Sequence, residues 1–178
     1  RSLVGSEMCI RDRYCMITTQ DIKKIYEWSK ETTFPLKKAP VIKGGYCNKI
    51  VYISWLKGVG KQVTIRKKLM TDEIYNIFLN EDILYATYSR FLEGTIIYPH
   101  RDPPVYRERY KRIQIPLSIP DKNTCFMLWD GRKVTWEEGV YQVYPVMDVI
   151  HEGYNLSTKA MEFVMIDVKL DTIVEDET

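Results

Sequence analysis

The sequence predicts a mainly β fold, an all-β sandwich or barrel with N-terminal helices bracing one face. Two observations indicate this class. The second half of the chain consists of short strand-like runs separated by turn sequences rich in Gly, Pro, Asp and Asn. Helical periodicity is confined to two segments of the first half. Strands are expected at about 83–91, 95–99, 111–118, 124–129, 132–136, 140–144 and 160–168.

The first half supplies the bracing elements. The sequence after Thr18 can cap a helix whose inner face carries Ile22, Ile25 and Tyr26. The expected elements are that helix to about Lys30, strands at 50–55 and 62–66, and a short helix from Thr71 to Leu79.

Residues 1–13, RSLVGSEMCIRDR, show neither apolar periodicity nor a signal-peptide layout. The stretch from Gly5 to Asp12 can be encoded by GGC TCG GAG ATG TGT ATA AGA GAC, which looks like a sequencing-library adapter. We therefore interpret residues 1–13 as a cloning or sequencing scar, with a native disordered N-terminus as the alternative. Residues 16–178 are then expected to form one domain.

Composition narrows the class of protein. With 45% hydrophobic and 28% charged residues, the 178-residue chain suits one soluble globular domain. The first 13 residues hold three of the 26 basic and two of the 24 acidic residues, which leaves 23 against 22. This balance gives no nucleic-acid signal, and no apolar run is long enough for a membrane span. Cys15, Cys47 and Cys125 form no paired motif, which favours a reducing, cytoplasmic setting.

The two histidines of the chain provide the main chemical signal. His100 and Asp102 lie in the stretch IYPHRDPP, and His151 lies in DVIHEGYN. Residues two apart on a strand point the same way, so His100 and Asp102 could grip one ion while His151 returns on a distant strand. Two imidazoles and one carboxylate form the facial triad of non-haem Fe(II) oxygenases, which leaves three coordination positions open. Zinc can take the same ligands, and from the ligands alone both metals remain candidates.

Five segments carry a resemblance to a known family. They are SRFLEGTIIYPH (89–100), RIQIPL (112–117), WEEG (136–139), HEGYN (151–155) and FVMIDV (163–168). In order and spacing, the block 89–168 resembles the aspartyl/asparaginyl β-hydroxylase family of 2-oxoglutarate-dependent dioxygenases. The resemblance implies a double-stranded β-helix, the jelly-roll or cupin-like core. It also implies Fe(II) as cofactor and 2-oxoglutarate and O2 as co-substrates.

Individual residues carry over from the resemblance. His100 and His151 match the family's iron-binding histidines. Ser89 matches a serine that contacts the 2-oxoglutarate carboxylate. Arg112 matches an arginine of the cosubstrate pocket, and Gln114 stands where the family has a histidine. Arg112 and Gln114 share one strand face, opposite Ile113, Ile115 and Leu117, as expected for a polar wall backed by a packed face.

The chain departs from the family at two positions. Asp102 stands where the animal enzymes have glycine, so the triad is complete here. Met161 aligns with the family's main arginine for the distal carboxylate of 2-oxoglutarate, and methionine cannot make that bidentate bond. Lys159 lies two residues earlier and is expected to replace the arginine if the strand has already begun. The alternative is a solvated Lys159 and weak use of 2-oxoglutarate.

The expected function is Fe(II)- and 2-oxoglutarate-dependent hydroxylation, with succinate and CO2 as co-products. The expected substrate is a protein or peptide side chain of the Asp/Asn type. Two alternatives remain at this point: a jelly-roll binding module that has lost catalysis, and a zinc-dependent cupin-type enzyme. Aromatic residues Trp55, Trp129 and Trp136 could line a substrate wall or simply fill the core. The basic run around Arg107 and Arg109 could select substrate or be a solvated loop.

Overall fold

The computed structural model describes residues 16–39, 46–59, 63–103 and 109–174. The interpretation of residues 1–13 and the role of Cys15 lie outside these ranges. Two β-sheets form the body of the structure. The larger has the strand order β10 (Gln142–Tyr144), β7 (Tyr110–Ser118), β12 (Met161–Lys169), β5 (Ile83–Phe91), β3 (Val51–Val59) and β2 (Lys37–Lys38), with β4 (Val63–Ile65) also paired to β3. The smaller has the order β6 (Thr95–His100), β11 (His151–Asn155), β8 (Cys125–Trp129) and β9 (Arg132–Thr135).

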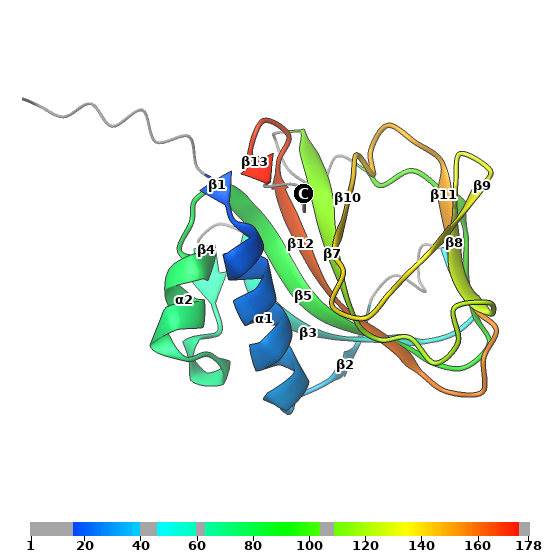
Figure 1. Cartoon of the computed structure of the whole chain (residues 1–178), viewed down its shortest axis with the longest axis horizontal. Helices are drawn as coiled ribbons and strands as arrows, with labels where there is room; N and C mark the ends of the chain where they lie inside the picture. Colours follow the sequence, from blue (N-terminus) through cyan, green and yellow to red (C-terminus); the bar gives the residue numbers. More distant parts are fainter. Residues whose placement is uncertain (1–15, 40–45, 60–62, 104–108, 175–178) are drawn as a thin grey trace, which may run out of the picture.

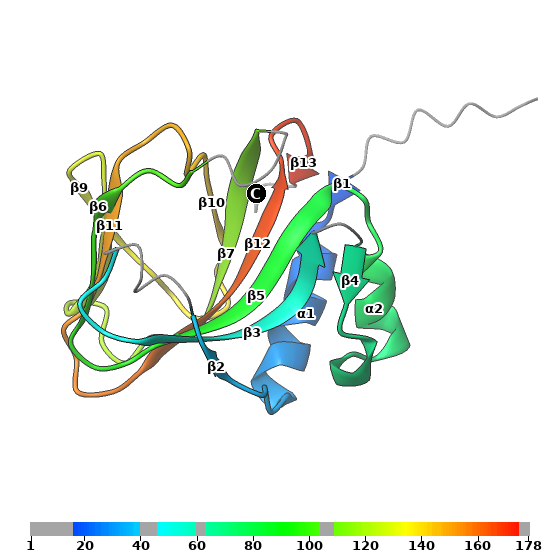
Figure 2. The same cartoon turned by 180° about the vertical axis from the view of Figure 1, so that it is seen from behind.

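The helices lie on one side of the larger sheet and the smaller sheet lies on the other (Figure 1, Figure 2). Helix α1 spans Thr19–Glu31, helix α2 spans Asp72–Phe78, and a 3-10 turn covers Lys67–Leu69. A short parallel pair, β1 (Met16–Ile17) with β13 (Ile173–Val174), joins the two ends of the described chain. The predicted mainly β, jelly-roll architecture with bracing helices is confirmed.

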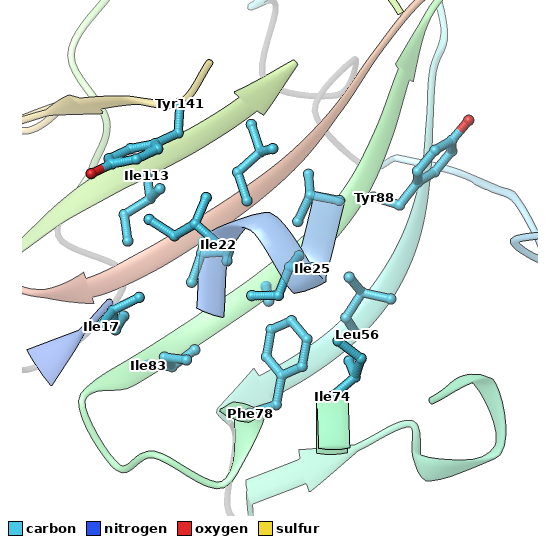
Figure 3. Close-up of a cluster of buried hydrophobic side chains, with 14 of the residues drawn as sticks. Ile17, Ile22, Ile25, Leu56, Ile74, Phe78, Ile83, Tyr88, Ile113 and Tyr141 are labelled. Atoms are coloured by element: carbon cyan, nitrogen blue, oxygen red, sulfur yellow. The ribbon is translucent and has the colours of Figure 1, made fainter. Parts of the chain in front are cut away.

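Helix α1 forms where the sequence predicted it. Thr18 caps the helix by accepting a hydrogen bond from the backbone of Asp21, whose side chain in turn accepts from the backbone of Thr18. Ile22 and Ile25 are fully buried against the larger sheet, in the core drawn in Figure 3. From the sheet, Ile113 and Ile115 of β7 enter the same core. The odd-numbered face of β7 is therefore the packed face, as expected.

A second apolar cluster lies between the two sheets and includes Phe91, Met161 and Phe163. Strands β5, β7 and β12 thus bury both faces, one against the helices and one toward the smaller sheet. Because both faces of the large sheet are covered, its central strands are almost continuously buried. The inward face is the one that carries the candidate site.

The strand β11 was not predicted, although the seven strands expected after residue 82 are all present. Its inward positions are His151, Gly153 and Asn155, all buried, where a strand normally shows apolar residues. A pattern based on apolar alternation therefore passes over the strand that carries a candidate ligand. The two-residue strands β1, β2 and β13 are too short to leave a periodic signal.

A lysine is buried under the larger sheet. Lys57 of β3 is only 3% exposed, and its Nζ donates to the backbone oxygen of Asn80 at 2.7 Å. Burial lowers the pKa of Lys57 to about 8, against the opposing attraction of Glu81 and Asp82. The desolvation free energy of the charged Lys57 ammonium is large enough to lower the stability of the fold.

We expect the free energy of unfolding to rise as pH increases from about 8 to 10. Over this range the unfolded chain still holds the lysine proton, and the folded state has released it, so deprotonation favours the fold. Lys57→Met should remove this rise and stabilise the protein at pH 7 by about 1–3 kcal/mol. Urea unfolding at several pH values measures both effects. The exposed Lys68→Met serves as the control, and an unchanged pH slope in Lys57→Met would contradict the assignment.

Candidate metal centre

Strand pairing brings the two histidines together. His100 ends β6 and His151 begins β11, and the two residues are direct cross-strand partners in the antiparallel ladder. A register shift follows between His151 and Gly153. The imidazole rings lie 4.4 Å apart between centroids. The return of a distant strand beside His100, expected from the spacing, is thus present in the fold.

Asp102 completes the cluster from the segment after β6. Its backbone N–H donates to the oxygen of Val146 at 3.1 Å, which ties this segment to the chain that leads into β11. Its Oδ1 atom lies 3.3 Å from Nε2 of His100 and 3.6 Å from Nε2 of His151. One ligand atom from each residue lies within 4.8 Å of the others, and in the described ranges this is the one group of three that could hold a metal.

Both imidazoles are oriented by backbone carbonyls. Nδ1 of His100 lies 2.6 Å from the oxygen of Tyr98, and Nδ1 of His151 lies 3.1 Å from the oxygen of Val149. A carbonyl oxygen can only accept, so each Nδ1 carries the proton and donates it. In the neutral imidazoles, each Nε2 therefore presents its lone pair toward Asp102. Such backbone contacts are the usual way in which a metal-ligating histidine is oriented.

The electrostatics of the cluster favour a cation at its centre. Burial by itself raises the pKa of Asp102, but Arg112 and the two imidazoles outweigh it and hold that pKa far below its usual range. Burial by itself lowers the pKa of His100, but the Asp102 carboxylate and the Tyr98 carbonyl outweigh it, so the pKa is raised. Two lone pairs and a carboxylate oxygen that face one another need a proton or a metal ion between them. The donor set fits a divalent transition metal.

Arg112 lies beside the cluster and is engaged by two carboxylates. Its Nη1 is 2.7 Å from Oδ2 of Asp102, and its Nε and Nη2 donate to the two oxygens of Asp167 at 2.7 and 3.0 Å. The sequence predicted that Arg112 lines the cosubstrate pocket, and it does line the cavity. However, each of its three nitrogens already has a carboxylate partner, so a role in gripping the far carboxylate of a cosubstrate does not fit this geometry.

A cavity of about 530 Å³ opens from the cluster between the two sheets. Ser89 and Gln114, both predicted as cosubstrate residues, line it and are buried. The hydroxyls of Ser89 and Thr87 lie 3.2 Å apart. The Gln114 Oε1 accepts from Nε1 of Trp136 at 3.1 Å. Met161 also lines the cavity and is 1% exposed, so an apolar side chain occupies the position aligned with the family arginine.

The expectation for Lys159 is wrong in its geometry. Strand β12 begins only at Met161, so the argument that Lys159 shares its face does not hold. Lys159 is exposed in the connection before the strand and does not line the cavity. Its backbone oxygen accepts hydrogen bonds from the side chains of Asn155 and Ser157, which hold this turn in place. The solvated alternative is the one that the structure supports.

The predicted aromatic and basic residues fall in different places. Trp55 and Trp136 line the cavity, whereas Trp129 stacks on His151 with 5.5 Å between ring centroids. Arg109 pairs with Asp148 at an exposed position, and Arg107 lies outside the described residues. Two of the three tryptophans therefore line the cavity, and Arg109 of the basic run is engaged by a carboxylate.

The sequence reasoning missed Asp167. It is 2% exposed and lines the cavity. The signal was present: Asp167 is the one charged residue within FVMIDV, the stretch 163–168. A lone carboxylate in a buried strand calls for a partner, because an unpaired buried charge is very unfavourable. Its parity matches the inward residues Phe163 and Met165 of the same strand.

The family model of aspartyl/asparaginyl beta-hydroxylase matches residues 57–169. The match covers well over half of the chain and contains every member of the metal cluster. The chain belongs to this family. It is therefore an enzyme of the hydroxylating dioxygenase class. The match also begins before residue 89, so it includes α2 and the last three residues of β3 as well.

One of the similar solved structures supports the fold. A 2OG-Fe(II) oxygenase family oxidoreductase from Burkholderia pseudomallei is 11% identical, with a TM-score of 0.56 over 86% of this chain and 81% of that one. A predicted oxalate decarboxylase from Thermotoga maritima is 13% identical, with a TM-score of 0.48 over 80% of this chain and 96% of that one. Among curated protein sequences no relative matches this chain significantly. Neither α-helix in the described ranges is long and apolar enough to cross a membrane.

We expect Mn(II) or Fe(II) to raise the unfolding temperature of the wild-type protein, because an ion held by three folded-state ligands stabilises the fold by about 2.7 kcal/mol at a hundredfold excess over Kd. His100→Ala and His151→Ala should lose this rise. The effect should also vanish as pH falls, since protons compete for Nε2 of His100, whose pKa is raised. Thermal unfolding with and without a chelator measures it. Asp148→Asn, an exposed carboxylate, is the control, and an equal rise in His100→Ala would refute the site.

Proposed function

We propose that this protein is an Fe(II)- and 2-oxoglutarate-dependent dioxygenase that hydroxylates a C–H bond and releases succinate and CO2. The observation that carries the proposal is the convergence of His100, Asp102 and His151 in the lining of one cavity. Family membership supplies the reaction class, and the three-residue donor set supports iron rather than a purely structural role. His100, Asp102 and His151 would hold the ion through Nε2, Oδ1 and Nε2.

The bound iron would supply the oxygen chemistry, and the chain supplies orientation and shielding. The backbone carbonyls of Tyr98 and Val149 keep the Nε2 lone pairs directed at the ion position. Much of the lining of the cavity is apolar and aromatic, which would limit the access of water to the reacting atoms. Three ligands on one side leave positions for a chelating 2-oxo acid and for O2.

We infer that neutral donors hold the far carboxylate of 2-oxoglutarate. Arg112 is engaged by Asp102 and Asp167, and among the described lining residues there is no lysine and no other arginine. Gln114 offers donors instead. An indole N–H can only donate, so Trp136 fixes the amide oxygen of Gln114 and leaves its NH2 group for the cavity. The hydroxyl of Ser89 is the second donor that supports this anchor.

The proposed substrate is a protein or peptide side chain, of the Asp/Asn type that the family description names. Two exposed aromatic residues support an entry for a large substrate. Trp55 is 42% exposed and Tyr46 is 37% exposed, and both line the cavity. Partly exposed aromatic rings beside a cavity suit contact with a peptide chain.

We expect anaerobic addition of Fe(II) and 2-oxoglutarate to give a weak visible charge-transfer band, and addition of O2 to give succinate. Peptides that contain Asp or Asn should raise the rate of succinate formation and gain one oxygen atom. His100→Ala and His151→Ala should show neither the band nor succinate. Zn(II) in place of Fe(II) is the metal control, and Asp148→Asn is the protein control. Folded, iron-loaded protein that shows neither signal would exclude the proposed function.

Ser89→Ala and Gln114→Leu test the anchor. Each removes a donor to a charged group, so the Kd for 2-oxoglutarate should rise about tenfold or more, with Mn(II) affinity unchanged. Trp136→Phe should give part of the Gln114 effect, because the amide is then free to turn. Ser118→Ala, at the end of β7 and outside the cavity lining, is the control. Equal 2-oxoglutarate affinity in Ser89→Ala, Gln114→Leu and Ser118→Ala would reject these anchors.

A further inference from the structure

The two carboxylate oxygens of Asp102 have separate partners. Oδ1 faces Nε2 of both histidines at 3.3 and 3.6 Å, and Oδ2 lies 2.7 Å from Nη1 of Arg112. Among the described residues, the backbone hydrogen bond of Asp102 runs from its N–H to the oxygen of Val146, and this bond does not fix the rotation of the carboxylate. Arg112 fixes it by holding Oδ2.

Arg112 is in turn held from behind by Asp167. The two residues are direct cross-strand partners on β7 and β12. Nε and Nη2 of Arg112 donate to the two oxygens of Asp167 in a bidentate pair at 2.7 and 3.0 Å. This pairing uses one edge of the planar guanidinium, so Nη1 projects from the other edge toward Asp102. The Asp167 side chain is 3% exposed and lies outside the group of three metal ligands.

We propose that Asp167 is a positioning residue for the metal centre, acting through Arg112 to present a single oxygen of Asp102 to the ion. This inference rests on the proposed function, in which His100, Asp102 and His151 hold a divalent metal. In this arrangement Arg112 holds Asp102, the proposed metal ligand, and does not bind the cosubstrate.

The arrangement has two chemical consequences. With Oδ2 engaged, Asp102 can offer only Oδ1, and a carboxylate that binds through one oxygen leaves more positions open for a chelating 2-oxo acid and O2. Asp167 also balances the charge of Arg112. Without it, an unpaired guanidinium 2.7 Å from the ligand carboxylate would oppose the approach of a dication.

A purely structural role for the pair explains less. The inward face of β12 is otherwise apolar around this position, with Phe163 and Met165 lining the same cavity. Burying an ion pair in such a place is often no better for stability than well-packed apolar side chains. A function at the metal accounts for why a carboxylate and a guanidinium, rather than two aliphatic residues, occupy this position.

Asp167→Asn tests the inference with little change in volume. The amide NH2 faces a donor nitrogen of Arg112, so the bidentate pair is lost while the strand remains. We expect the Kd for Mn(II), measured by electron paramagnetic resonance without cosubstrate, to rise about 10–100-fold. The signal of the bound ion should also change shape. Arg112→Lys should give a similar loss, because a lysine cannot bridge two carboxylates. Asp167→Glu should recover part of the affinity.

The matched control is Asp82→Asn, which breaks the 3.0 Å pair between Asp82, in the turn before β5, and Lys169, at the end of β12. Its Mn(II) affinity should stay within about twofold of wild type. If Asp167→Asn is folded and binds Mn(II) as tightly as Asp82→Asn does, the inference is overturned. If Asp167→Asn does not fold, Arg112→Lys is compared with Asp82→Asn in the same way, and equal Mn(II) affinity overturns the inference. Wild-type protein that binds no divalent ion overturns the proposed function and the inference together. A metal affinity that depends on Asp167, without turnover of 2-oxoglutarate, supports the inference and rejects the proposed reaction.

Discussion

The antiparallel pairing of β6 with β11 is the contact on which the candidate site depends. It places His100 directly opposite His151, although fifty residues of chain separate them. The same pairing sets the direction in which the segment after His100 leaves the sheet, and Asp102 lies on that segment. A slip of one residue in this register would turn one imidazole to the outer face, and the three candidate ligands would no longer converge. Gly153 permits the fit, because an added side-chain carbon there would lie 3.2 Å from Ile97.

The charges of Asp102, Arg112 and Asp167 determine which partners each of these side chains can bind. Asp102, Arg112 and Asp167 form a chain of two carboxylates about one guanidinium, and its net negative charge suits a neighbouring dication. The larger sheet supplies Arg112 and Asp167 on adjacent strands, and the smaller sheet supplies both histidines. The metal centre is therefore built across the gap between two sheets. Its geometry depends on how the sheets pack, and the buried aromatic residues between them, such as Phe163 and Trp136, stabilise that spacing.

The fold class and the three residues of the candidate metal cluster could be predicted from the sequence, because they leave local patterns. The alternation of Arg112 and Gln114 with Ile113 and Ile115 fixed the inward face of β7 correctly. Strand β11 left no such pattern, since its buried positions carry His, Gly and Asn. The prediction that Lys159 shares the inward face of β12 was wrong, because this strand begins two residues later, at Met161. The pairing of Arg112 with Asp167 depends on the register of β7 against β12, which no local pattern specifies.

In the proposed reaction, the pairing of Arg112 with Asp102 also limits how 2-oxoglutarate can be held. A dicarboxylate bound through the metal at one end and through neutral hydroxyl and amide donors at the other gains less from its distal group than it would from an arginine. More of its binding energy must then come from chelation of the ion. In such a site the affinity for the cosubstrate depends more strongly on the bound metal than it does in a site with a distal arginine, because chelation supplies most of the binding energy. In the proposed reaction, Asp102 would strengthen the metal position in the same molecule in which Met161 removes the distal charge, so the two departures from the family would act in compensating directions.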